Sequence, residues 1–163
     1  MTGENPFETR PCEYDAWYDE NENVYRSEVL AIRKLLPQKK GLWVEIGVGS
    51  GRFASKLGID IGIEPADGIA KLARKRGVKV KKGRAEEVPL PDGSAAAAFL
   101  ITSLCFIADM KRAFAEVNRL LVPGGTVIVA FVPRDSRLGE LYAKSASQDL
   151  FLRHAYLLSL IHI

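Results

Sequence analysis

The sequence has little cysteine, little histidine and no long hydrophobic run. Only two of its 163 residues are cysteine and two are histidine, so it shows neither a disulfide framework nor the ligand spacing of a metal site. No stretch reaches the roughly 18 consecutive apolar residues of a membrane span. Residues 1–10 are polar and lack the apolar core of a signal peptide. These absences favour a reducing cytoplasm, with no metal and no membrane span.

Length and composition predict one globular domain. The chain is 47% hydrophobic and 26% charged, which is enough to build a core at this length. Its net charge of +3 is too small to indicate nucleic-acid binding. One basic run, residues 71–84, could be an RNA surface, but we expect its lysines on an edge strand, where they discourage pairing with other chains. The sequence does not indicate an oligomeric state.

Hydrophobic periodicity predicts strands that alternate with helices. Short apolar runs predict strands over residues 42–46, 59–63, 78–82, 97–102 and 126–131. Helical spacing predicts helices over residues 24–36, 53–57, 66–76 and 109–121, with only helical sequence after residue 138. Residues 1–22 are expected to be irregular. The alternation predicts an α/β fold, which is a Rossmann-like, doubly wound, mostly parallel sheet with helices on both faces.

A glycine-rich loop joins the first predicted strand to a helix. Residues 44–52 read V-E-I-G-V-G-S-G-R, and such glycines let the backbone turn sharply and approach a ligand. The N–H groups of the following helix point at that ligand. A dinucleotide fingerprint, G-x-G-x-x-G, would need glycine at position 52, where this chain has Arg52. The loop therefore favours a nucleotide cofactor other than a dinucleotide, with a plain turn as the alternative.

Glu64 is expected to share one crevice with this loop. It follows the second predicted strand, and parallel sheets bind ligands beyond the carboxyl ends of their strands, where the strand order reverses. A carboxylate there can accept two hydrogen bonds from the ribose hydroxyls of an adenosine. Dinucleotide enzymes also use an acid at this place, so Glu64 does not separate the two cofactor classes. A solvated loop carboxylate is the alternative.

Three motifs resemble those of class I S-adenosylmethionine-dependent methyltransferases. The acidic-x-G-x-G-x-G pattern at residues 45–51 resembles motif I of that class. Residues 83–92, G-R-A-E-E-V-P-L-P-D, are similar to the G-x-A-E-x-L-P-F-P-D stretch of its UbiE/COQ5-like (type 11) members. Residues 121–125, L-V-P-G-G, resemble the turn into their fifth strand. The resemblance covers residues 41–131.

The resemblance implies S-adenosyl-L-methionine as the cofactor. The glycines would let the backbone approach it, Glu45 would face its ammonium group, Glu64 would bind its ribose, and residues 85 and 86 would lie beside its adenine. The cofactor-binding residues expected in this way are Glu45, Gly47, Val48, Gly49, Gly51, Glu64, Pro65, Ala85, Glu86 and Thr102. The sequence identifies no metal ligand and no general base.

Tyr14, Trp17 and Tyr18 are expected to form a lid or contact the substrate. Aromatic rings attract a sulfonium through cation–π interaction, although the same rings could instead pack onto the core. Residues 102–105, T-S-L-C, stand where amino-methylating nucleic-acid enzymes of the class carry Asn/Asp-Pro-Pro-Tyr/Phe. The absence of that motif favours a small-molecule methyl acceptor and makes nucleic acid an unexpected partner.

The chain departs from the family pattern in two places. Family members continue Ser-Phe-Asp before the fourth strand, but Ser94 is followed here by four alanines, which puts folding efficiency in doubt. The sixth and seventh strands of the family fold are expected to be missing, so the domain is expected to be C-terminally truncated. Residues 158–163, L-S-L-I-H-I, resemble the read-through of a sequencing adapter, with an ordinary amphipathic helix as the alternative.

These observations predict three segments. They are a lid segment and helix over residues 1–37, an S-adenosylmethionine-binding core over residues 38–132 and a helical extension over residues 133–163. The predicted function is transfer of a methyl group from S-adenosylmethionine to a small molecule. A nicotinamide-dependent Rossmann oxidoreductase and a truncated, non-catalytic cofactor-binding remnant are the alternatives.

Overall fold

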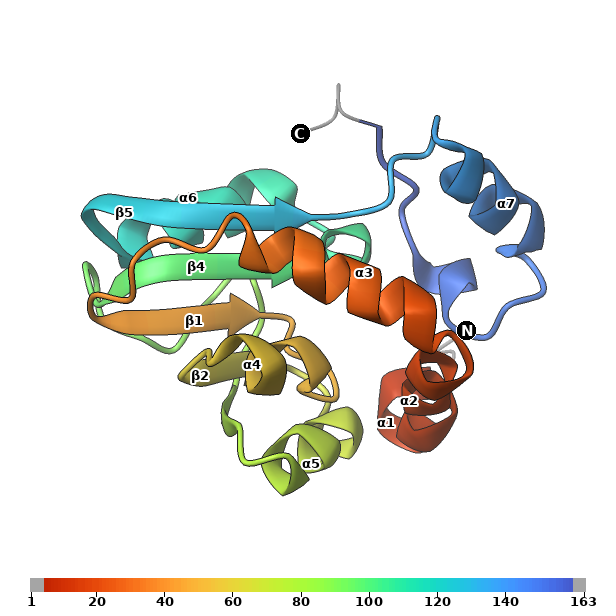
Figure 1. Cartoon of the computed structure of the whole chain (residues 1–163), viewed down its shortest axis with the longest axis horizontal. Coiled ribbons are helices and arrows are strands. Elements are labelled where there is room, and N and C mark those ends of the chain that lie inside the picture. The colour runs from red at the N-terminus through yellow and green to blue at the C-terminus, as the bar shows by residue number, and fades with distance from the viewer. Residues whose placement is uncertain (1–4, 160–163) are drawn as a thin grey trace.

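The fold is built on a five-stranded parallel sheet (Figure 1). The computed structural model describes residues 5–159, and their strands are β1 (Leu42–Ile46), β2 (Ile61–Glu64), β3 (Lys79–Lys82), β4 (Ala95–Ile101) and β5 (Leu121–Ala130). The strand order is β3-β2-β1-β4-β5, and each neighbouring pair is parallel. The order reverses between β1 and β4, which confirms the predicted Rossmann-like topology. β3 is an edge strand, as expected for its lysines.

Helices cover both faces of the sheet (Figure 1). They are α1 (Pro6–Thr9), α2 (Pro11–Glu20), α3 (Glu22–Arg33), α4 (Arg52–Leu57), α5 (Asp67–Lys75), α6 (Met110–Leu120) and α7 (Arg137–Ser145), with 3-10 turns at Leu104–Phe106 and Leu152–His154. Two apolar clusters fill the interior. One joins α3 and α4 to one face of the sheet, and the other joins α6 to the opposite face.

The alanine run before the fourth strand is accommodated inside the sheet. Ala95, Ala97 and Ala98 are fully buried in β4. The aromatic contact comes from Phe99, whose ring lies 5.3 Å from that of Trp43 on β1. The small side chains therefore pack inside the sheet, where β4 lies between β1 and β5, and Phe99, the next residue along the strand, fills the core.

The expectation that residues 1–22 are irregular is wrong for the part that the structure describes, because residues 6–22 form α1, α2 and the start of α3. Asn5 caps α1 by accepting a hydrogen bond from the Phe7 N–H at 3.1 Å. Pro6 and Pro11 begin α1 and α2, where a missing N–H costs nothing. The apolar periodicity of these short helices is weak, so the pattern that revealed the other helices could not reveal them.

The C-terminal segment is helical only in part, contrary to the expectation from sequence. α7 ends at Ser145, and the Asp149 carboxylate then accepts hydrogen bonds from the N–H groups of Phe151 and Leu152, which favours a turn. Leu158 is buried, and its carbonyl accepts a hydrogen bond from the Arg134 N–H at 2.7 Å. Of the adapter-like residues 158–163, the last four lie outside the described residues. The division at residues 37 and 132 stays a prediction.

None of the helices in residues 5–159 is long and apolar enough to cross a membrane.

Candidate functional site

The glycine loop is held between β1 and β2 by backbone hydrogen bonds. The N–H groups of Gly47 and Val48 both donate to the Ile63 carbonyl, at 2.8 and 3.0 Å. Gly47, Gly49 and Gly51 all have positive φ angles, of 78°, 52° and 78°, which only glycine adopts without strain. A Cβ on Gly47 would lie 2.5 Å from the Cβ of Ser103. The loop therefore requires glycine for both its conformation and its packing.

A cavity of about 320 Å³ lies at the carboxyl ends of β1, β2 and β4. It occupies the position where the strand order reverses, which is where parallel sheets bind ligands. Every predicted cofactor-binding residue except Gly51 lines it, namely Glu45, Gly47, Val48, Gly49, Glu64, Pro65, Ala85, Glu86 and Thr102. Gly51 instead faces Ala73 and Val78, so it permits close packing of the loop on α5.

Glu64 holds the loop from the end of β2. Its Oε2 accepts a hydrogen bond from the Gly49 N–H at 2.9 Å, and its Oε1 accepts one from the Ala66 N–H at 3.0 Å. Burial raises the pKa of this carboxyl, although the two backbone hydrogen bonds act to lower it. Each carboxylate oxygen retains a further lone pair, so Glu64 can still accept hydrogen bonds from a ligand in the cavity.

Glu45 is the most deeply buried charged residue at the site, with 1% of its surface exposed. It lines the cavity, and its Oε2 atom has no hydrogen-bond partner among the described residues. Burial raises the pKa of the carboxyl well above its usual range, against a backbone hydrogen bond from Ala54. A buried acceptor without a partner is costly, so this atom is suited to a ligand that donates a hydrogen bond or carries positive charge.

The other walls come from the loops after β3 and β4. Glu86 accepts hydrogen bonds at Oε1 from the N–H groups of Ala108 and Asp109, which ties the loop after β3 to the start of α6. Thr102 has a positive φ of 53°, and its N–H donates to the Ala130 carbonyl at 2.7 Å. Such a conformation is uncommon for threonine and is typical of functional sites.

The aromatic residues of α2 line cavities and also pack in the core, and their role as a lid stays a prediction. Tyr14 and Tyr18 line the cavity, and their hydroxyl oxygens are 3.2 Å apart. Burial raises the pKa of Tyr14, and it raises that of Tyr18 to about 12, so both phenols stay neutral. Tyr18 also packs in the core against Tyr25 and Phe53. Trp17 does not line this cavity but a second one beside it.

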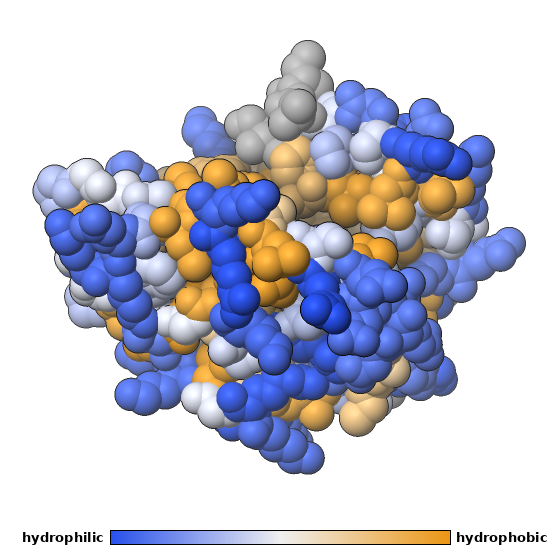
Figure 2. Space-filling view, viewed as in Figure 1, coloured by the Kyte–Doolittle hydropathy of each residue, from blue (hydrophilic) through white to orange (hydrophobic). Residues whose placement is uncertain are grey.

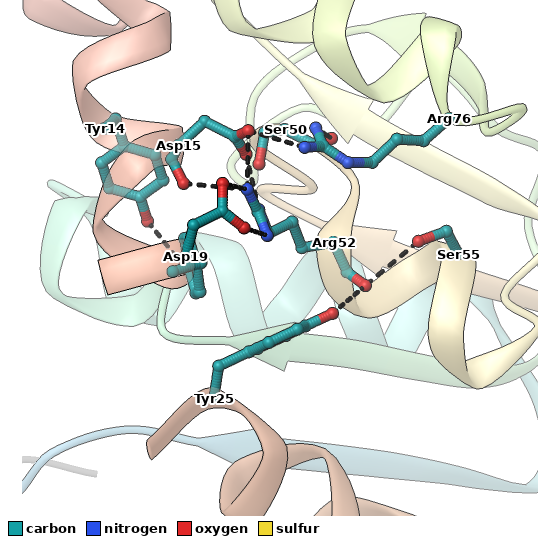
Figure 3. Close-up of polar contacts among 9 residues, drawn as sticks. Tyr14, Asp15, Asp19, Tyr25, Ser50, Arg52, Ser55 and Arg76 are labelled. Atoms are coloured by element: carbon teal, nitrogen blue, oxygen red, sulfur yellow. Dashed lines mark hydrogen bonds and ion pairs between the residues drawn. The ribbon is translucent and has the colours of Figure 1, made fainter. Parts of the chain in front are cut away.

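An ion-pair network fixes α2 on the glycine loop (Figure 3). Arg52, the first residue of α4, makes a two-pronged contact with the Asp15 carboxylate, with N–O distances of 2.8 and 2.9 Å. It also pairs with Asp19 at 2.7 Å. Arg76 reaches the same Asp15 carboxylate at 2.6 Å and donates to the Ser50 carbonyl at 2.9 Å. The side chains of Arg52 and Asp15 are only 12% and 14% exposed, so solvent screens this pair weakly.

Several residues of the site escape prediction from sequence. In the sequence Arg52 stands out only as a departure from the dinucleotide fingerprint, because its carboxylate partners lie 37 and 33 residues away. Phe7 and Phe106 line the cavity with their rings 5.0 Å apart, but no periodic pattern marks either one. Ser103, whose hydroxyl donates to the Ile46 carbonyl at 2.9 Å, could have been found from its position after the fourth strand.

Comparisons with known proteins identify relatives of this chain. A family model described as a methyltransferase domain matches residues 44–129. An uncharacterized protein of Methanocaldococcus jannaschii is 39% identical over 155 residues, which cover 95% of this chain and 75% of the relative. An uncharacterized protein of Mycobacterium tuberculosis is 38% identical over 83% of this chain, but the match spans only 48% of the relative.

A solved structure is also similar to this chain. It is a protein of Thermotoga maritima described as an SAM-dependent methyltransferase and "possible histamine N-methyltransferase". It is 44% identical to this chain, with a TM-score of 0.90, and the match covers 95% of this chain and 73% of that one. The chain therefore spans about three quarters of two relatives and about half of a third.

Proposed function

The chain belongs to the methyltransferase domain family, and from this premise we propose that it transfers a methyl group from S-adenosyl-L-methionine to a small-molecule acceptor. One observation carries the proposal. The cavity at the strand-order reversal is lined by the glycine loop and by two acidic residues, Glu45 and Glu64, at the ends of β1 and β2. The bound cofactor supplies an electrophilic methyl group on a sulfonium, and the residues of the chain bind and orient it.

The residues present fit this cofactor. The unpartnered Oε2 of Glu45 is suited to the ammonium group of the methionine part. Gly47 and Gly49 line the cavity without a side chain, which leaves the loop backbone open to close approach. Glu64 is suited to the ribose hydroxyls, because it is already oriented by the Gly49 and Ala66 N–H groups.

The adenine end of the cofactor is assigned to the loop after β3. Ala85 and Glu86 line the cavity there, and they stand in the stretch that resembles UbiE/COQ5-like members. The hydrogen bonds of Glu86 to Ala108 and Asp109 give this wall a fixed position. Tyr14 and Tyr18 would cover the cofactor from α2, and neutral rings beside a sulfonium provide cation–π attraction.

Two features support S-adenosylmethionine over a nicotinamide cofactor. Arg52 stands where a dinucleotide fingerprint requires glycine. Its guanidinium donates hydrogen bonds to the carboxylates of Asp15 and Asp19, and a glycine at this position could not make these contacts. The family match covers the glycine loop and the L-V-P-G-G turn together.

A small-molecule acceptor is supported by what surrounds the cavity. The N/D-P-P-Y/F motif of nucleic-acid amino-methylating enzymes is absent after β4, and the basic run lies on and near the edge strand β3, away from β4 and β5. The description of the Thermotoga maritima protein also names a small acceptor. We assign positioning and the exclusion of water as the main contributions of this chain.

The test is a transfer assay with methyl-labelled S-adenosylmethionine and two arms of acceptors, a panel of small amines, alcohols and thiols and a total RNA preparation. We expect label on at least one small molecule and none on RNA. Label on RNA alone would contradict the proposed acceptor class. No transfer, with no binding of S-adenosylhomocysteine by folded protein, would support the non-catalytic remnant.

A further inference from the structure

A second cavity, of about 540 Å³, adjoins the first. Four side chains, Tyr14, Tyr18, Thr102 and Phe106, line both cavities, so the two share a wall. The second cavity extends from α2 and α3 to α7 and the segment after it. On the surface, hydrophobic residues gather around the C-terminal end of β5 and beside α7, with a hollow between them (Figure 2). The volume of the second cavity is in the range of small-molecule binding sites.

The walls of this cavity combine aromatic rings with acidic groups. Away from the shared wall, Trp17, Phe131, Tyr142, Phe151 and Tyr156 contribute rings. The charged residues that line it are all acidic, namely Glu13, Glu20, Glu28 and Asp149, and no lysine, arginine or histidine of the described chain lines it. Carboxylates and π faces both attract cations, so the cavity favours a positively charged ligand with an apolar body.

Glu28 is the carboxylate available to such a ligand. Asp149 already accepts two backbone hydrogen bonds, and Glu13 pairs with Arg10 at 3.5 Å. Glu20 is exposed to solvent. Glu28 is half-buried on α3, and among residues 5–159 it has no hydrogen bond or ion pair. Burial raises the pKa of its carboxyl, which reflects a desolvation cost that a cationic ligand would offset.

We infer that the second cavity binds the methyl acceptor and that it selects a small organic cation with an apolar body, whose positive charge is recognised by Glu28. This inference rests on the proposed methyltransferase function and adds the chemical class of the acceptor. Glu28 lines only the second cavity and not the shared wall. It is therefore a specificity-determining residue that holds one end of the ligand, while the shared wall faces the other end.

The test uses three probes of nearly equal shape on protein saturated with S-adenosylhomocysteine. They are 2-phenylethylamine, which is a cation, 2-phenylethanol, which is neutral, and 3-phenylpropionate, which is an anion. Titration calorimetry should show the amine binding about tenfold or more tightly than either other probe, as expected for a partly buried charge pair. Glu28→Gln should remove this preference and leave the affinity for S-adenosylhomocysteine unchanged.

The matched control is Glu22→Gln. Glu22 lies on the same helix, is exposed, pairs with Arg26 at 3.9 Å and lines neither cavity. We expect this variant to keep the preference for the amine. Two results would overturn the inference in a protein that binds S-adenosylhomocysteine. One is equal affinity of the wild-type protein for the three probes, and the other is a preference for the amine that survives Glu28→Gln. If S-adenosylhomocysteine itself does not bind, the proposed function fails, and the inference fails with it.

Discussion

The conformation of Gly47 is the residue-scale feature on which the site depends most. Gly47→Ala would force a Cβ to within 2.5 Å of Ser103 at a φ of 78°. We expect the loop to shift away from β4 and the affinity for S-adenosylhomocysteine to fall at least tenfold, equivalent to about 1.4 kcal/mol. Titration calorimetry measures this loss.

Gly58→Ala is the control for backbone strain. Gly58 also has a positive φ, of 70°, but a Cβ added there would meet nothing within 4 Å, and the residue lines neither cavity. The substitution should cost about 1 kcal/mol of stability from strain alone and leave binding intact. If both variants lost the same amount of affinity, close packing of the loop would not explain the requirement for glycine.

Glu64 should be intolerant even of an isosteric change. Its two carboxylate oxygens each accept a backbone N–H, so in Glu64→Gln the side-chain NH₂ group must face one of these donors. We expect S-adenosylhomocysteine to bind more weakly by about 1–3 kcal/mol. Glu87→Gln, an exposed carboxylate that lines neither cavity, should bind normally. If Glu64→Gln bound S-adenosylhomocysteine with wild-type affinity, the assignment of Glu64 to the cofactor site would be wrong.

At the scale of elements, the position of α2 depends on the ion pairs that join it to the glycine loop (Figure 3). Asp15→Asn removes a partly buried charge shared by Arg52 and Arg76. We expect the free energy of unfolding in urea to fall by roughly 2 kcal/mol. Asp19→Asn, at a carboxylate that is 72% exposed, should cost clearly less. Equal losses in the two variants would show that burial of the Asp15 pair adds no stability.

The contribution of Asp15 should also depend on pH. Burial acts to raise the pKa of its carboxyl, but hydrogen bonds with Arg52, Ser50 and Arg76 lower it to about 2, from an ordinary value of 3.8. The stabilisation is therefore fully present above the ordinary value and is lost as the pH falls through about 2. The stability difference between wild type and Asp15→Asn should shrink over that window, and a constant difference would contradict the assigned ion pair.

Elements with strong periodicity could be predicted from sequence, and those held by distant contacts could not. The predicted 42–46 strand coincides with β1, and the helix predicted over residues 109–121 is α6, which Asp109 caps by accepting a hydrogen bond from the Arg112 N–H at 2.9 Å. α2 escapes prediction because its stability comes from partners such as Arg52, 37 residues away from Asp15. The end of α7 escapes prediction because Asp149 competes for backbone N–H groups.

At the scale of the whole molecule, the sheet topology explains which parts of the site were predictable. Residues at the ends of β1, β2 and β4 converge because parallel strands end at one edge, so the glycine loop, Glu64 and Thr102 could be placed together. The second cavity is bounded by α2, α3 and the segment after β5. No local sequence pattern relates these elements, so neither that cavity nor Glu28 could be predicted.

The most direct test of the cofactor assignment is a calorimetric titration of the purified chain with S-adenosylhomocysteine, with NAD titrated in parallel. We predict one binding site for S-adenosylhomocysteine and none for NAD. Binding should also raise the melting temperature, because saturation at 100 times the dissociation constant adds about 2.7 kcal/mol of stability. Binding of NAD in preference to S-adenosylhomocysteine, or of neither ligand by a protein that melts cooperatively, would contradict the assignment of the cavity.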